Sequence, residues 1–270
     1  MSFRLTGFAC VLSLLNAMAL PAQRRFEEIR RFPAAEARQG VAVDARSVYA
    51  VGTREIGKYD KKSGELIARW QGQEGDRILH LDSGVIIDGK LYCAHSNYPG
   101  VPMTSSVEVW DANTLQHIES HSFGILRGSC TWIDRHRGYW WAAFAHYDKL
   151  KAETLHGTEY TCVVQFDTNW REIQSWVFPD TIIDRFRPMS NSGGAWGPDN
   201  MLYCTGHDRP EVYLLRLPRA GSILELAAIL PFAAKGQGIA WDPVETGVLY
   251  GIDKAKKEVI VSRLHEPVRP

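Results

Sequence analysis

The chain has 270 residues, of which 45% are hydrophobic and 23% are charged. These values are ordinary for a folded globular protein and differ from those of a disordered chain. Its 31 basic and 31 acidic residues balance to zero net charge. The composition therefore gives no electrostatic footprint for nucleic acid or for an anionic membrane surface.

The first 22 residues have the features of a secretory signal peptide. Arg4 supplies a basic start, a short apolar stretch follows, and the sequence AMA at 17–19 is an A-x-A cleavage pattern, with Ala22 as a second cleavage point. The apolar run is too short to span a bilayer comfortably, although a buried N-terminal helix is an alternative. We expect a secreted or periplasmic protein without a membrane anchor after cleavage, with one domain over 23–270.

Four cysteines follow the expected signal peptide. They are compatible with two disulfides in an oxidising compartment and equally with four buried thiols. Their spacing matches no zinc motif. These cysteines are Cys93, Cys130, Cys162 and Cys204.

From the N-terminus onward, the chain repeats a phrase of four short apolar runs separated by turn residues. The first complete unit reads QGVAVD, SVYAVG, IGKYDKKSGE and LIARWQ, and the second reads SGVIID, KLYCAH, VEVWDANTLQ and HIESHSF. The third unit opens with SCTWID, the fourth with GGAWGPD and the fifth with QGIAWD. Four strands repeated every 40–50 residues, roughly, are typical of β-propeller blades. The units start at Gly40, Gly84, Cys130, Gly194 and Gly238.

The third interval is the longest, because it carries insertions around 148–160 and 180–188. The fifth unit ends after VIVSRL without a fourth run, whereas the segment 26–44 resembles 224–242 in spacing. Residues 26–32 would therefore supply the missing outer strand. This predicts an all-β, five-bladed β-propeller with four-stranded blades, closed by the N-terminal strand joining the last blade. An open β-sandwich is the rival fold, but it does not explain why the two ends complement each other.

The aromatic-Asp turns and the QGxAxD openings resemble a broad superfamily of bacterial β-propellers. This superfamily includes YVTN/YncE-like, lactonase-like and quinoprotein-like proteins, and the resemblance covers nearly the whole mature chain. It implies the propeller fold, whereas the activities of members range from lactonases, cyclases and lyases to binding scaffolds. The calcium ligands of gluconolactonase-type propellers and the site of five-bladed glutaminyl cyclases are not matched here residue by residue.

Three histidines follow the second run of their units in matching positions. In a propeller, the start of the first strand and the end of the second strand share one face, so these side chains are expected at one axial pocket. We predict His95, His146 and His207 as catalytic residues, together with His80 and Asp82. Further candidates for ligand binding on the same approach are Gln39, Tyr98, Arg127, Trp132, Asn191, Trp196 and Gln237.

Two kinds of chemistry suit these histidines. They can act as acid or base near neutral pH, with a carboxylate such as Asp82 orienting the ring. Alternatively, His95, His146 and His207 can hold one divalent metal ion if the axial channel is narrow. The alternative without a function is that each histidine is exposed or forms hydrogen bonds only to nearby residues. Gln39 and Gln237 would then form hydrogen bonds only to neighbouring loops.

The sequence favours an enzyme of the hydrolase, lyase or cyclase type acting on a small polar substrate, a sugar or a lactone. No GxSxG motif or activated cysteine supports nucleophilic catalysis. A non-catalytic ligand- or protein-binding propeller is the alternative, and a structural scaffold with incidental histidines is a third possibility. We expect a small molecule or carbohydrate as partner, no nucleic acid, and a monomer.

Overall fold

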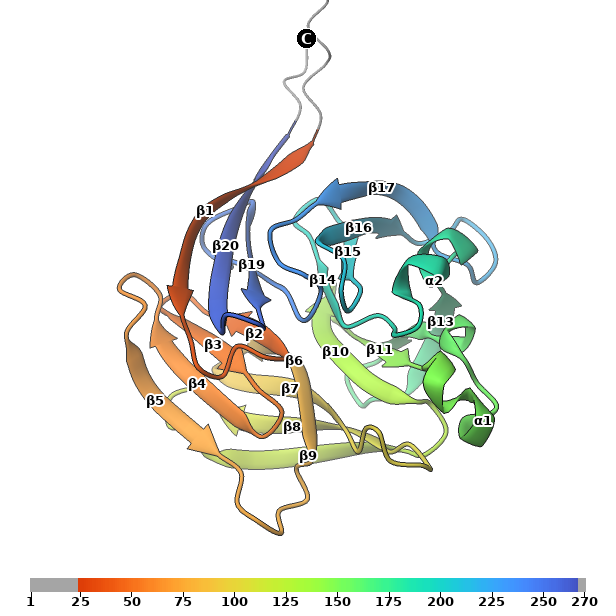
Figure 1. Cartoon of the computed structure of the whole chain (residues 1–270), viewed down its shortest axis with the longest axis horizontal. Coiled ribbons are helices and arrows are strands. Elements are labelled where there is room, and N and C mark those ends of the chain that lie inside the picture. Colours follow the sequence, from red (N-terminus) through yellow and green to blue (C-terminus); the bar gives the residue numbers. More distant parts are fainter. Residues whose placement is uncertain (1–23, 267–270) are drawn as a thin grey trace, which may run out of the picture.

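The computed structural model describes residues 24–266. Five four-stranded antiparallel sheets are arranged in a ring around one axis (Figure 1). The predicted all-β, five-bladed β-propeller is therefore confirmed. The signal peptide expected over 1–22 lies outside the described residues.

Each of the first four blades is built from consecutive strands, with the earliest strand nearest the axis. Blade 1 contains β2 (Gly40–Val43), β3 (Ser47–Val51), β4 (Glu55–Asp60) and β5 (Leu66–Gln71). Blade 2 contains β6 (His80–Ile87), β7 (Lys90–Ser96), β8 (Ser105–Asp111) and β9 (His117–Gly124). Blade 3 contains β10 (Ser129–His136), β11 (Tyr139–Ala145), β12 (Cys162–Phe166) and β13 (Glu172–Val177). Blade 4 contains β14 (Gly193–Trp196), β15 (Leu202–Thr205), β16 (Glu211–Arg216) and β17 (Glu225–Pro231).

Blade 5 joins the two ends of the chain. Its strands are β18 (Ala240–Trp241), β19 (Val248–Asp253), β20 (Glu258–His265) and, as the outer strand, β1 (Arg25–Pro33). The pairing of β1 with β20 is antiparallel and runs from Arg25 opposite His265 to Pro33 opposite Glu258. The predicted closure of the ring by the N-terminal strand is confirmed.

The repeated aromatic-Asp turns act as local hydrogen-bonding devices. The carboxylate of Asp60 accepts from the backbone N–H groups of Lys62 and Ser63. Asp111 and Asp167 make the same kind of contact in the next two blades. Such turns favour a sharp reversal between the third and fourth strands, and the repeat therefore marks turns rather than chemistry.

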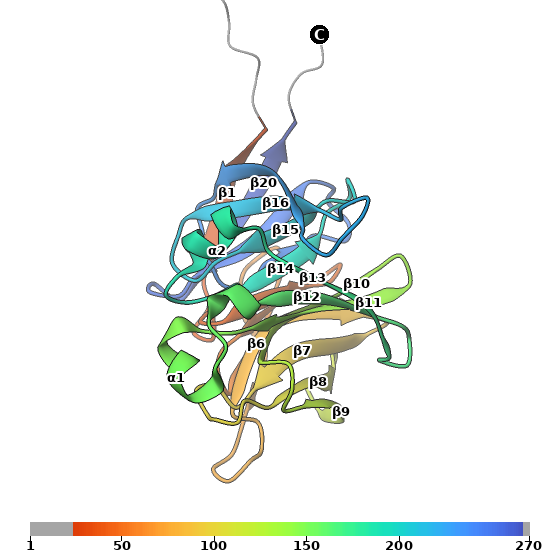
Figure 2. The ribbon, with the colours of Figure 1, turned by 90° about the vertical axis from the view of Figure 1, so that its right-hand side faces the viewer.

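The helices lie on one face of the disc, which we call the upper face. The connection from β11 to β12 contains η1 (Asp148–Leu150), α1 (Lys151–Thr154) and η2 (Thr158–Tyr160), and the connection from β13 to β14 contains α2 (Asp180–Phe186). Figure 2 shows the disc edge-on, with α1 and α2 on the same side. The opposite face, where the first strands end, is the lower face. No helix within 24–266 is long and apolar enough to cross a membrane.

The cores lie between neighbouring blades and contain the cysteines. Cys93, Cys130 and Cys204 are buried and Cys162 is half-buried, and all four carry free thiols. Of the two alternatives left open by the sequence, the structure therefore has four separate thiols. Burial raises the pKa of each of these four thiols, which keeps them protonated and unreactive.

Candidate functional site

The innermost strands approach one another closely where they begin, at the upper face. A Cβ atom added to Gly238 would lie 2.6 Å from the Cβ of Ser83 and 2.8 Å from the Cα of Gly40. Only glycine fits at such contacts, which explains the glycine in the repeated QG openings. The three strands thus form a packed floor. We call the group of polar and aromatic side chains that lies above this floor, at the upper face, the axial mouth.

Asp82 is placed at the axial mouth by a β-bulge. Leu81 pairs with His95 and Gly84 pairs with Cys93, so two residues, Asp82 and Ser83, oppose a single residue of β7. Bulges of this kind change the direction of a side chain and are common beside active sites. Asp82 is only 5% exposed, and its carboxyl group makes no hydrogen bond to residues 24–266, although its oxygens keep some contact with solvent. Burial raises the pKa of Asp82 well above its usual range.

His80 lies beside Asp82 on the same strand. The Nε2 atom of His80 lies 3.7 Å from a carboxyl oxygen of Asp82. Burial, with a smaller contribution from His95, lowers the pKa of His80 to about 4. A neutral imidazole therefore faces a carboxyl group that tends to keep its proton.

An aromatic wall borders this pair. The ring of Tyr98 lies 5.3 Å from that of His80 and 4.7 Å from that of Tyr147. The Nζ atom of Lys149 lies 4.9 Å from the centre of the Tyr98 ring, within range of a cation–π contact. Burial raises the pKa of Tyr147, and the nearby Asp82 raises it further. The wall thus carries one cation, and neither Tyr147 nor Lys149 was among the predicted site residues.

A second polar group at the upper face comes from blades 4 and 5. The imidazole of His207 contacts Asp208 through Nδ1 at 2.6 Å, and Lys254 Nζ lies 3.2 Å from its Nε2. Burial and the ammonium of Lys254 lower the pKa of His207, while Asp208 opposes this shift. Lys254 follows the second strand of its blade, as His146 and His207 do, so the repeat contained the signal that would have identified it.

His95 does not face the axial mouth but is bonded inside blade 2. The backbone N–H of Leu79 donates to Nε2 of His95 at 2.9 Å, so Nδ1 carries the hydrogen and donates to Ser106 Oγ at 2.7 Å. Ser106 in turn donates to Glu108 at 2.6 Å. Because both ring nitrogens are occupied, His95 is held as a structural residue in this arrangement.

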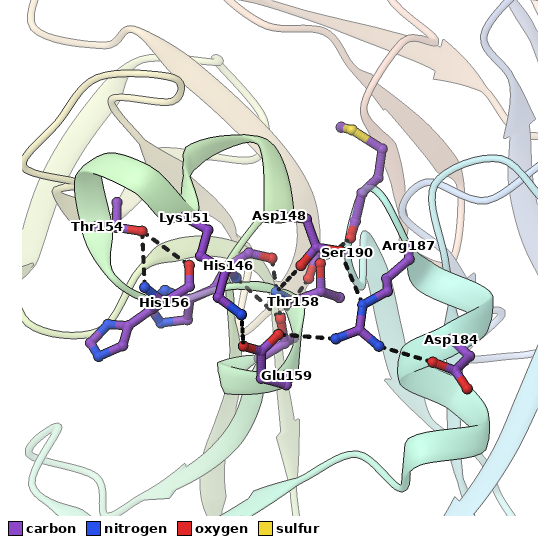
Figure 3. Close-up of polar contacts among 12 residues, drawn as sticks. His146, Asp148, Lys151, Thr154, His156, Thr158, Glu159, Asp184, Arg187 and Ser190 are labelled. Carbon is purple, nitrogen blue, oxygen red and sulfur yellow. Dashed lines mark hydrogen bonds and ion pairs between the residues drawn. The ribbon is translucent and has the colours of Figure 1, made fainter.

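His146 lines a separate cavity between blades 2 and 3, which we call the His146 pocket. Its volume is about 260 Å³. Burial and the neighbouring His156 lower the pKa of His146 to about 4. The rings of His146 and His156 meet edge to face at 5.1 Å (Figure 3). The lining residues are Val101, Pro102, Met103, Ile125, Leu126, Gly128, His146, Tyr147, Leu150, Glu153, Thr154 and His156.

The insertion 148–160 forms one wall of this pocket, on the same face as the axial mouth. It contributes His156, which the repeat does not identify because the insertion lies outside it. Gly128 is required opposite His146, since its φ is +97° and an added Cβ would lie 2.8 Å from Nε2 of that histidine.

The three histidines proposed as metal ligands have separate environments: His95 in blade 2, His146 beside His156, and His207 beside Lys254. Across residues 24–266, no three His, Cys, Asp or Glu side chains are grouped as metal ligands. The three histidines therefore do not fit the predicted metal site.

Two of the predicted ligand-binding residues are buried and bonded to each other. The indole N–H of Trp132 donates to Asn191 Oδ1 at 2.6 Å. The amide of Asn191 donates to the carbonyls of Gly193 and Thr205 at 3.0 and 2.8 Å. Their polar groups thus join blades 3 and 4 and are not free for a ligand.

The two predicted glutamines bond to nearby loops. Gln39 donates to Thr53 Oγ1 at 3.2 Å, and Gln237 donates to the carbonyl of His207 at 3.3 Å. Gln237 is only 2% exposed. They therefore support the rim of the axial mouth from below.

Arg127 and Trp196 lie away from the axial mouth. Arg127 forms an ion pair with Glu172, at the start of the outer strand of blade 3. Trp196 ends β14 at the lower face, where its ring stacks on His136 at 4.6 Å. Of the twelve predicted residues, the axial mouth thus brings together His80, Asp82, Tyr98 and His207.

Comparisons with known proteins show similarity at the level of the fold. No family model matches the chain, and no curated protein does either. A PQQ-bound aldose sugar dehydrogenase from Streptomyces coelicolor has a similar structure, with a TM-score of 0.56 at 11% sequence identity, over 92% of this chain and 100% of that one. A luciferin-regenerating enzyme is similar with a TM-score of 0.52 at 10% identity, over 91% and 99% of the two chains. The fold-level resemblance to quinoprotein-like propellers is confirmed.

Proposed function

We propose that the protein is a propeller enzyme that acts on a small polar substrate, a sugar or a lactone, at the axial mouth. The observation that carries this proposal is the Asp82 carboxyl group, buried without a hydrogen-bond partner among the described residues and 3.7 Å from His80. Burial disfavours the charged form of a carboxyl group, and carboxyl groups perturbed in this way are frequent at functional sites.

The two groups suit general acid–base catalysis, because their pKa values are displaced in opposite directions from those in water. In lactone hydrolysis, His80 would take a proton from water as the water oxygen bonds to the carbonyl carbon. Asp82 would give its proton to the ring oxygen as the ring C–O bond breaks. The same exchange of protons serves eliminations and cyclisations.

The residues around Asp82 and His80 suit a polar substrate that contains a sugar or lactone ring. The Tyr98 ring offers a face for stacking a sugar or lactone ring. Lys254, which is held beside His207, can donate hydrogen bonds to oxygens on which negative charge develops. The two proteins of similar fold are themselves enzymes, one of them a sugar dehydrogenase, which is consistent with an enzymatic propeller. The N-terminal sequence adds secretion or export to the periplasm to this proposal.

The experiment is to screen the mature protein against a panel of aldonolactones and aryl glycosides, and then to compare Asp82→Asn and His80→Gln with wild type. We expect each variant to lower kcat by about 10²–10⁴-fold, the range for loss of a general acid or base. Asp88→Asn is the matched control, since Asp88 lies in the hairpin at the other end of the same strand pair.

Unchanged turnover in both variants, with the wild type active, would rule out acid–base chemistry by this pair. Saturable binding of a panel member without any turnover would instead support the alternative of a non-catalytic ligand-binding propeller.

A further inference from the structure

We propose that the His146 pocket is a second binding site, for a small aromatic alcohol whose ring fills the apolar part and whose hydroxyl group donates to His146. The pocket lies beyond Tyr147, which separates it from the axial mouth. The proposal does not depend on catalysis at Asp82 and His80, because its contacts come from other residues.

The apolar part of the pocket fits a ring. Met103 comes from the loop between β7 and β8, Leu126 from the loop before β10, and Leu150 from the insertion. Leu126 is 88% exposed and Ile125 is 56% exposed, so two large apolar side chains at the opening have little protein covering them. A cavity of about 260 Å³ is slightly smaller than most ligand sites, which favours a single-ring molecule.

The polar part of the pocket accepts hydrogen bonds. His146 is neutral at physiological pH, so one of its ring nitrogens is an acceptor. Glu153 adds a carboxylate to the lining, whereas the hydroxyl of Thr154 already donates to the carbonyl of Leu150. Such a lining favours a ligand that donates a hydrogen bond and disfavours one that carries a carboxylate.

The wall formed by the insertion is held in place by Arg187, which directly follows α2. Its guanidinium donates to Asp148 at 3.0 Å, near the start of the insertion, and to Glu159 at 3.1 Å, near its end (Figure 3). A third bond joins Arg187 to Asp184 of α2 at 2.9 Å. One side chain thus fixes both ends of the segment that carries His156, which makes Arg187 a positioning residue for the pocket.

Three probes of similar shape test the proposal: 4-methylphenol, toluene and 4-methylbenzoate. Binding is measured by NMR titration of the full mature chain, with wild type compared against His146→Phe. We expect 4-methylphenol to bind about fivefold more tightly than toluene, the size of effect of one net hydrogen bond. We expect 4-methylbenzoate to bind most weakly, because it would face Glu153. His146→Phe should remove the preference for the phenol.

Three further variants make the test specific. His121→Phe is the matched control and should bind as wild type, since His121 packs on Trp170 in the outer part of the neighbouring blades. Leu126→Glu should weaken binding of both neutral probes without affecting folding, because the side chain is exposed. Arg187→Gln should weaken binding several-fold by releasing the wall.

Equal affinity for 4-methylphenol and toluene, or an unchanged phenol preference in His146→Phe, would overturn the proposal. Asp82→Asn should leave binding of the probes intact, so that failure of the proposed catalysis and failure of this site can be told apart. If His146→Phe does not fold, Leu126→Glu provides the test. Unchanged binding of the probes to Leu126→Glu would mean that they bind outside the His146 pocket.

Discussion

At the scale of single residues, His95 and His207 both lie near the end of the second strand of their blades but are one residue apart in register, since Cys93 pairs with Gly84 and Cys204 with Gly194. His95 is buried and bonds to Leu79 and Ser106, whereas His207 is partly exposed and its ring nitrogens contact Asp208 and Lys254. The difference arises because β8 offers Ser106 beside His95, and the chain before β6 turns the N–H of Leu79 toward it. Position in the repeat therefore predicts which face a residue reaches, but not which partners its polar atoms contact.

His95→Ala should destabilise the protein by about 1–3 kcal/mol, because the N–H of Leu79 would lose its acceptor and Ser106 its donor. Urea denaturation monitored by tryptophan fluorescence measures the change. His207→Ala is the control near the end of the second strand of blade 4 and should cost less than about 1 kcal/mol, since its contacts are partly exposed. Similar losses in the two variants would contradict the structural role of His95.

The same reasoning explains how much of the site could be predicted. His80 and Asp82 were predicted from their place at the start of the first strand of blade 2, and the structure has them side by side. Trp132 was misplaced because alternation along a strand does not reveal that a bulge turns its indole toward Asn191. The partners of a side chain depend on the neighbouring blade, and no local pattern encodes them.

At the scale of secondary-structure elements, the loop between β9 and β10 shows how one glycine positions the His146 pocket. Gly124 and Gly128 both have positive φ, at +71° and +97°. A Cβ on Gly124 would meet nothing within 4 Å, whereas one on Gly128 would lie 2.6 Å from the carbonyl oxygen of Ala145. Only the second glycine is therefore required by close packing as well as by its backbone angle.

Gly128→Ala should be more destabilising than Gly124→Ala by about 1–3 kcal/mol, the usual cost of forcing an extra carbon into a packed site. Thermal and urea denaturation of the two variants give this difference directly. Because the backbone strain of alanine is also larger at the φ of Gly128 than at that of Gly124, equal stabilities would mean that a small shift of the loop relieves both the strain and the contact with His146.

The strand pattern was predictable from the sequence because the turns between strands contain side chains that hydrogen-bond to the nearby backbone. Asp60, Asp111 and Asp167 bond to backbone groups a few residues ahead, so the ends of the strands are encoded locally. The insertion 148–160 has no such repeat. Its short helices are held by Arg187, a residue distant in sequence, which is why its role as a pocket wall was left open.

At the scale of the whole molecule, β1 connects blade 5 to both of its neighbours. The ring of Phe32 packs 6.1 Å from that of Tyr59 in blade 1, and Phe26 lies edge-on to Phe232, next to β17 of blade 4, at 5.1 Å. Phe32 is 6% exposed, whereas Ile29 on the same strand is 44% exposed. The strand thus contributes to the interfaces between blades as well as to its own sheet.

Phe32→Ala should lower the free energy of unfolding by about 3–5 kcal/mol, as expected for a buried aromatic side chain. Ile29→Ala serves as the control on the same strand and should change it by less than about 1 kcal/mol. Differential scanning calorimetry tests whether the loss is cooperative. A separate early transition in Phe32→Ala would mean that blade 5 opens independently of the ring.

The antiparallel pairing of β1 with β20 also has a practical consequence for engineering. Arg25 and His265 are direct partners, so a short linker could join the two ends of the described chain. New ends could then be opened at Gly75, in the exposed connection between β5 and β6, where an added Cβ would meet nothing within 4 Å. In such a circular permutant every blade would be continuous in sequence. Comparing its unfolding rate with that of the natural order would measure how much kinetic stability comes from sharing one blade between the two ends.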